Sequence, residues 1–173
     1  MNSRLPYEIG LDTEATTLRE ADHLLHGLAA ELAFPEGGFA CTHLVRGERP
    51  RVALSFSTTS RRWARSTREQ LAAGGYDVSP TAPDEAGRAV LYPGVSALTG
   101  TVTIAELLAA SAIDDVIVLG APGAPDPDQL LVTQDHVRPT WKSGELILAT
   151  MPAAGGVLIP FEVPNPTPCC ADP

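Results

Sequence analysis

The chain has 173 residues, of which 44% are hydrophobic and 19% charged; this composition fits one globular domain and excludes an intrinsically disordered protein. Its formal net charge of −9 argues against general nucleic-acid binding, because proteins of that class usually carry a basic domain. The N-terminal residues lack the apolar stretch of a signal peptide, and no apolar run reaches the length of a membrane span. We therefore expect a soluble, cytoplasmic protein without membrane contact.

The first third of the sequence predicts a helix followed by a hairpin. Residues 1–12 contain Pro6 and Gly10 and are expected to form a loose leader. A helix is expected from about Glu14 to Ala33, because leucine and alanine recur on one side and Thr17 with Glu20 has the spacing of a capping box. Two strands are expected next, joined by a turn whose residues are rich in glycine and proline. Their ranges are Phe39 to Val45 and Arg51 to Phe56, and the turn is Gly47–Pro50.

The middle of the chain predicts a second helix and then a strand–helix–strand unit. The helix is expected from about Thr59 to Ala73, since two glycines follow it, and Tyr76 to Val78 is expected to form a short strand. In the next unit the strands are Arg88 to Tyr92 and Asp114 to Leu119. A capping box at Thr103–Glu106 opens the helix between them. The unbroken apolar run in the second of these strands predicts full burial.

The C-terminal third predicts an antiparallel meander and an extended tail. The expected strands are Leu130 to Thr133, Glu145 to Thr150 and Val157 to Phe161, separated by glycine-containing turns. Together the elements predict the α+β class, with a mixed β-sheet and about three helices. We expect a single domain at residues 1–163 and a proline-rich tail at residues 164–173, which carries a pair of cysteines.

Basic residues are concentrated in one segment of this acidic protein. Seven of the twelve basic residues lie between Arg46 and Arg68, where Glu48 is the single acid. On the second predicted helix, Arg61, Arg65 and Arg68 are spaced i, i+4, i+7 and share one face. Such a polarised charge favours contact with an acidic protein partner or with another copy of the chain. A solvated helix face is the simpler interpretation of the same pattern.

The turn before this helix is a second candidate site. It combines four hydroxyl residues with two arginines at the start of a helix, where free backbone N–H groups attract anions: Ser57, Thr58, Thr59, Ser60, Arg61 and Arg62. The sequence therefore predicts a site for a small phosphate or carboxylate metabolite, as in an enzyme or sensor. Ser and Thr are also favoured helix caps, which is the structural alternative. Trp63 is expected to pack in the core.

Cysteines supply a third hypothesis. Cys41 and His43 point to the same side of a predicted strand, and Cys169 with Cys170 lies in the tail. These four side chains match a zinc or other soft-metal site in number and type, although the spacing is not that of a zinc motif; the tail pair also suits a thiol function. Neither a Gly-x-Ser-x-Gly elbow nor a nucleotide-binding fingerprint is present, so the sequence leaves catalysis open. The leading hypothesis is a binding or accessory protein that uses the arginine stripe.

Overall fold

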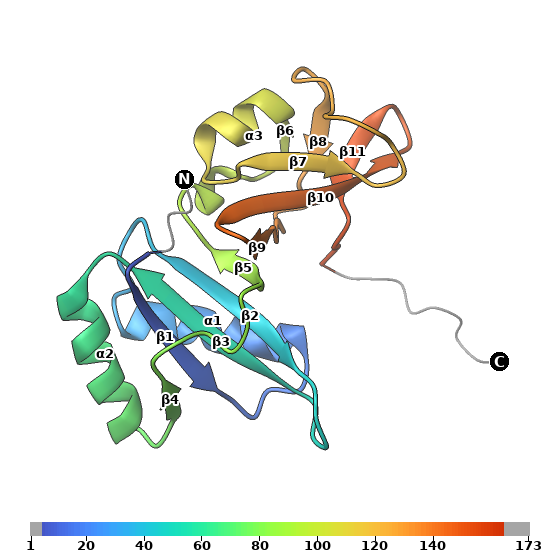
Figure 1. Ribbon diagram of the computed structural model, residues 1–173. Coiled ribbons are helices and arrows are strands. Elements are labelled where there is room, and N and C mark those ends of the chain that lie inside the picture. The colour runs from blue at the N-terminus through green and yellow to red at the C-terminus, as the bar shows by residue number, and fades with distance from the viewer. Residues whose placement is uncertain (1–4, 165–173) are drawn as a thin grey trace. The chain divides into compact units, whose positions relative to one another are not determined.

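The computed structural model describes residues 5–164, and the chain packs as two compact units (Figure 1). Within the described range, unit 1 consists of residues 5–93 and 140–146, and unit 2 of residues 94–139 and 147–164. Three α-helices and eleven strands occur in the described range, with antiparallel and parallel pairs, which confirms the α+β class and the mixed sheet. The single domain at 1–163 stays a prediction. Apart from Pro164, the predicted tail lies outside the described residues.

The sheet of unit 1 is antiparallel throughout and has the strand order β4-β1-β3-β2-β5-β9. Its strands are β1 (Tyr7–Asp12), β2 (Phe39–Val45), β3 (Arg51–Thr58), β4 (Asp77–Ser79), β5 (Gly87–Leu91) and β9 (Thr140–Lys142). Helix α1 (Leu18–Glu31) connects β1 to β2, and α2 (Arg61–Ala73) connects β3 to β4. The resulting β-α-β-β-α-β order is that of the split βαβ motif, which by itself indicates no function.

One face of this sheet packs against α1 and α2 and forms the core of unit 1. Alternate residues of β3 point toward the helices because side chains alternate along a strand: Val52, Leu54 and Phe56. Trp63 of α2 packs with Phe34 and Phe56, with ring centroids 5.3 Å and 6.0 Å away, and its indole N–H donates to the carbonyl of Leu32 at 2.7 Å. The expected core position of Trp63 is therefore confirmed.

The N-terminal segment was wrongly predicted as a loose leader. It forms β1, which pairs with β3 on one side and β4 on the other, and its Ile9 and Leu11 are fully buried. Gly10 lies on the face of β1 opposite Ile9 and Leu11, and no side chain fits there: an added Cβ would lie only 2.1 Å from the backbone oxygen of Thr81. The segment that contains Thr81 therefore approaches β1 at backbone distance.

The second face of the unit 1 sheet is crossed by the connection between β4 and β5. In Figure 1 this segment passes in front of the sheet, whereas α1 lies behind it. Most residues at the centre of this face are small or polar, namely Gly10, Cys41, His43, Ala53, Ser55 and Ala89, whereas Phe39 and Trp141 bring aromatic rings to one end. The two faces of the sheet thus differ in chemistry, and buried polar groups collect on the face without helices.

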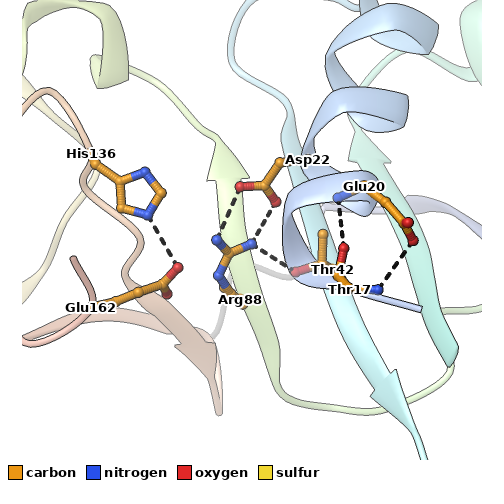
Figure 2. Close-up of polar contacts among 7 residues, drawn as sticks. All are labelled: Thr17, Glu20, Asp22, Thr42, Arg88, His136 and Glu162. Carbon is orange, nitrogen blue, oxygen red and sulfur yellow. Dashed lines mark hydrogen bonds and ion pairs between the residues drawn. The ribbon is translucent and has the colours of Figure 1, made fainter. Parts of the chain in front are cut away.

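A nearly buried ion pair joins α1 to the sheet (Figure 2). Arg88 on β5 donates from Nη1 to Asp22 Oδ1 at 2.6 Å and from Nη2 to Oδ2 at 3.0 Å, and Nη1 also donates to the Thr42 hydroxyl at 3.2 Å. The predicted capping box at the start of α1 is present: the Glu20 amide donates to the Thr17 hydroxyl, and the Thr17 amide donates to the Glu20 carboxylate. The capping box therefore sets the start of α1, and the ion pair between Asp22 and Arg88 holds the same helix against the sheet.

Unit 2 contains a second, mixed set of strands. Its elements are β6 (Thr101–Thr103), α3 (Ile104–Ala110), β7 (Asp115–Val118), β8 (Leu130–Val132), most of β10 (Glu145–Ala153) and β11 (Val157–Pro160), with a short 3₁₀ helix at Val95–Ala97. The β10–β11 pair is antiparallel as expected, whereas β8 runs parallel to β11 and β7 parallel to β10. The capping box at Thr103–Glu106 is present. His136 contacts the Glu162 carboxylate at 3.1 Å (Figure 2).

The prediction of full burial for the apolar strand near residue 117 was wrong. Val116 is buried, but Ile117 and Leu119 are each 41% exposed. The strand is covered on one face only, so an unbroken apolar run does not prove burial on both. No helix within residues 5–164 has the length and apolar character needed to span a bilayer.

Candidate functional site

The arginines of α2 divide into an exposed group and an anchoring residue. Arg61, Arg62 and Arg65 are exposed; we call these three the arginine face. Arg65 lies 3.6 Å from Glu69, and both side chains of this i, i+4 pair are mostly in solvent, so the pair leaves the guanidinium accessible. The arginine face lies on the side of α2 that does not pack on the sheet.

Arg68 makes a contact within the fold that the sequence did not predict. Its side chain is half-buried, and Nη2 donates to the backbone oxygen of Glu8 in β1 at 2.6 Å. Its Nε is buried and has no hydrogen-bond partner among the described residues. Arg68 thus ties α2 to β1, while its predicted role in partner binding stays a prediction.

The hydroxyl-rich turn before α2 forms a helix cap. The Ser60 hydroxyl accepts from the Trp63 amide at 3.2 Å, and the buried Thr58 hydroxyl accepts from the Ser60 amide at 3.0 Å. Ser57 points to the face of the sheet away from the helices, where it lines a cavity, and Thr59 is exposed. Two of the four hydroxyls are therefore used within the turn, and the small-anion site there stays a prediction.

A buried polar cluster lies on the face of the unit 1 sheet away from the helices. The register of β2 against β3 places Cys41 directly opposite Ser55 and His43 opposite Ala53, so that all three polar side chains share this face. His43 Nε2 lies 2.7 Å from Ser55 Oγ, and His43 Nδ1 lies 2.9 Å from the backbone oxygen of Ala86. We call Cys41, His43 and Ser55 the polar cluster; their exposed fractions are 5%, 7% and 3%.

The hydrogen bonds of His43 determine its tautomer. A carbonyl oxygen only accepts, so Nδ1 carries the hydrogen that is donated to Ala86. Burial lowers the pKa of His43, which favours the neutral ring and leaves Nε2 with a free lone pair. The Ser55 hydroxyl must therefore donate to Nε2. Burial, with the nearby charge of Glu8, raises the pKa of the Cys41 thiol to about 12 and keeps the sulfur protonated.

A cavity of about 20 Å³ adjoins the polar cluster, which is room for about one water molecule. One wall is aromatic, with the rings of Phe39 and Trp141 at a centroid distance of 4.7 Å. Three carboxylates also line it: the half-buried Glu8 of β1 and the exposed Asp84 and Glu85 of the β4–β5 connection. The cavity in unit 1 is therefore lined by the polar cluster, by two aromatic rings and by three carboxylates.

The predicted metal site is only partly described. Cys41 and His43 lie on one face of β2, as expected, but both are close to Ser55, and no group of three or more ligating side chains occurs within residues 5–164. Cys169 and Cys170 lie outside the described residues. A zinc or other soft-metal site stays a prediction, as does a thiol function of the tail.

Sequence reasoning missed Ser55 and the Ala86 carbonyl. A signal existed, because Cys41, His43 and Ser55 alternate along two strands that were predicted to pair. The observed register pairs Val45 with Arg51, which are the predicted strand ends, and it places Ser55 diagonally across from His43. The Ala86 carbonyl comes from a loop distant in sequence, so this second partner of His43 was not visible from local patterns.

We expect unit 1 to lose stability as the pH falls below about 6.5, the ordinary pKa of histidine. Unfolded His43 takes up a proton in this range, whereas folded His43 has a lowered pKa and stays neutral until the pH falls further. Denaturation at about pH 7.5 and about pH 5.5 is followed by the fluorescence of Trp63 and Trp141, both in unit 1. His43→Gln should reduce the difference between the two pH values. An unchanged difference in that variant contradicts the assignment to His43.

Comparison with protein-family models, with curated proteins and with solved structures found no match to this chain. The residues themselves therefore carry the functional argument.

Proposed function

We propose that this chain is a binding or accessory protein whose arginine face contacts an acidic protein partner. The observation that carries the proposal is the exposure of Arg61, Arg62 and Arg65 on one short helix of a protein with a net charge of −9. Arginine is enriched at protein interfaces because its planar guanidinium forms bidentate hydrogen bonds with carboxylates.

The inner side of α2 is held in place, which favours binding. Trp63 packs on Phe34 and Phe56, and Arg68 donates to the backbone of β1. A helix fixed in this way presents its outer side chains without first having to order its backbone, so less entropy is lost on association. This arrangement supports a preformed contact surface.

Charge complementarity favours a separate acidic protein over a second copy. Two copies that each carry a net charge of −9 repel one another at long range, whereas the arginine face attracts a carboxylate-rich surface. The acidic groups around the cavity lie on the sheet face opposite the helices. If the arginine face of one copy bound the acidic groups of another, the contact would be head-to-tail. Such a contact adds copies without end unless its rotation closes a ring. We therefore commit to a distinct partner.

Charge reversal of the arginine face is expected to remove the complex and leave the fold intact. In the variant Arg61→Glu/Arg62→Glu/Arg65→Glu, each new carboxylate repels the partner, and we expect affinity to fall by more than about tenfold. Native mass spectrometry of the protein purified gently from its own cells gives the mass of the partner, and tryptophan fluorescence checks the fold. Arg19→Glu, an exposed change on α1, is the matched control.

Two results contradict this proposal. One is a complex that persists unchanged in the triple variant, and the other is a bare monomer in the native spectrum of the unmodified protein. A mass that is a multiple of the chain's own mass would instead identify self-association, and loss of that oligomer in the triple variant would assign it to the arginine face.

A further inference from the structure

The polar cluster has the hydrogen-bond order of a base-activated serine. The Ser55 hydroxyl donates to His43 Nε2 at 2.7 Å, and His43 Nδ1–H donates to the Ala86 carbonyl at 2.9 Å. In serine hydrolases the same order runs from hydroxyl to imidazole to an acceptor that fixes the ring. Here a backbone carbonyl takes the acceptor's place, so the chain positions the ring without a carboxylate.

The surroundings hold the imidazole in the state that a general base requires. His43 is buried between β2 and the β4–β5 connection, and the lowered pKa of its ring keeps Nε2 unprotonated near neutral pH. Gly87 permits this arrangement, since an added Cβ there would lie 2.8 Å from both Cys41 Cβ and His43 Cε1. The neighbouring thiol of Cys41 stays protonated, and it is Ser55 whose hydroxyl meets His43 Nε2, so the base activates oxygen and not sulfur.

The adjoining cavity restricts what reaches Ser55. Its volume of about 20 Å³ admits a group of a few atoms at most, so the bulk of a larger molecule must stay outside. Glu8, Asp84 and Glu85 disfavour an anionic reactant at the opening, while the rings of Phe39 and Trp141 favour an apolar or cationic one. These features match a small, uncharged or cationic ester.

We propose that Ser55 is a nucleophile, with His43 as its general base, for small carboxylic esters that are uncharged or cationic. Ser55 Oγ forms a bond to the ester carbonyl carbon while its proton passes to His43 Nε2. The ester C–O bond then breaks, and the leaving alcohol takes that proton. His43 Nε2 then takes a proton from a water molecule, whose oxygen bonds to the acyl carbon. The bond from that carbon to Ser55 Oγ breaks, Ser55 Oγ takes the proton back from His43, and the carboxylic acid is released. This activity belongs to a site separate from the arginine face and does not depend on the function proposed above.

Methanesulfonyl fluoride tests the proposal because it is small and traps activated serines as stable sulfonyl esters. The Ser55 oxygen displaces fluoride, and the released proton leaves through His43. We expect a single adduct mapped to Ser55 by peptide mass spectrometry in the folded, full-length protein. Acetyl transfer from p-nitrophenyl acetate should show a burst of p-nitrophenol that the sulfonylated protein lacks.

Three variants separate the roles of the side chains. Ser55→Ala should lose the adduct and the burst, and His43→Gln should lower the rate of adduct formation by at least about 100-fold, the typical contribution of a general base. Gly27→Ala, a change on the exposed side of α1 and outside the polar cluster, should react at the same rate as the unmodified protein. Tryptophan fluorescence shows that each variant is folded.

The pH dependence of the unmodified protein gives a test that needs no variant. The rate of Ser55 labelling should rise with pH through a single pKa below about 6.5, as His43 loses its proton. Absence of an adduct on Ser55 in the folded protein overturns the proposal. So does an equal labelling rate in folded His43→Gln, or a rate that does not change across this pH range.

Discussion

Replacement of Asp22 by alanine is expected to destabilise unit 1 by about 3 kcal/mol, because it leaves the guanidinium of Arg88 without its bidentate partner. The two side chains are only 14% and 16% exposed, so water replaces the lost hydrogen bonds poorly. Removing one member of a buried ion pair leaves the other member's charge without its main compensation. The resulting loss of stability is larger than the net stabilisation that the intact pair provides. The readout is the urea midpoint followed by tryptophan fluorescence, which reports unit 1.

Two matched variants test the physical cause of this loss. The double change Asp22→Leu/Arg88→Met removes both charges and should recover most of the stability. Arg65→Ala breaks the exposed pair with Glu69 and should change stability by less than about 0.5 kcal/mol. If Asp22→Ala is as harmless as Arg65→Ala, the pair between α1 and β5 does not stabilise the fold as its burial indicates.

Gly10→Ala is expected to destabilise unit 1 by about 1–3 kcal/mol, the usual cost of overpacking. The new methyl group would lie 2.1 Å from the backbone oxygen of Thr81, and a backbone atom cannot rotate away as a side chain does. The β4–β5 connection must therefore move off β1. Since this connection also supplies Ala86 to His43, the variant should also change the reactivity of Ser55.

Gly27→Ala is the control for this substitution. Gly27 lies on the exposed side of α1, and an added Cβ there meets nothing within 4 Å. Alanine is the better helix former, so we expect a gain of about 0.5–1 kcal/mol. Both variants are measured by urea denaturation. Equal effects of the two changes would show that the approach of Thr81 to Gly10 is not a tight one.

Local signals predicted most of the elements, and their success has physical reasons. The capping boxes at Thr17–Glu20 and Thr103–Glu106 join neighbours in the chain, so sequence spacing alone identifies them. The strand at Tyr7–Asp12 was missed because it contains Gly10, and glycine is more typical of loops than of strands. The reason for a glycine here is the close approach of Thr81, a residue distant in sequence. The short strands β6 and β9 were also missed, since three residues give too little alternation to see.

The candidate sites show the same division. Exposure of Arg61 and Arg65 follows from helical periodicity, whereas the anchoring of Arg68 to Glu8 depends on where β1 lies. The contact of His43 with Ser55 depends on the register of the β2–β3 hairpin. One residue more or less in the loop would place the two side chains on opposite faces of the sheet. Side chains that act together across strands are thus the part of a site that a single sequence reveals least.

The interleaving of the two units along the chain has a consequence for biosynthesis. A chain made from its N-terminus has released residues 1–93 long before β9, the strand that pairs with β5 and carries Trp141, emerges. Until then β5 is an unpaired edge, and the cavity lacks the indole of its aromatic wall. Unit 1 therefore cannot be completed on the ribosome before residues 94–139 have been synthesised. The two units of this protein cannot fold strictly one after the other as the chain emerges.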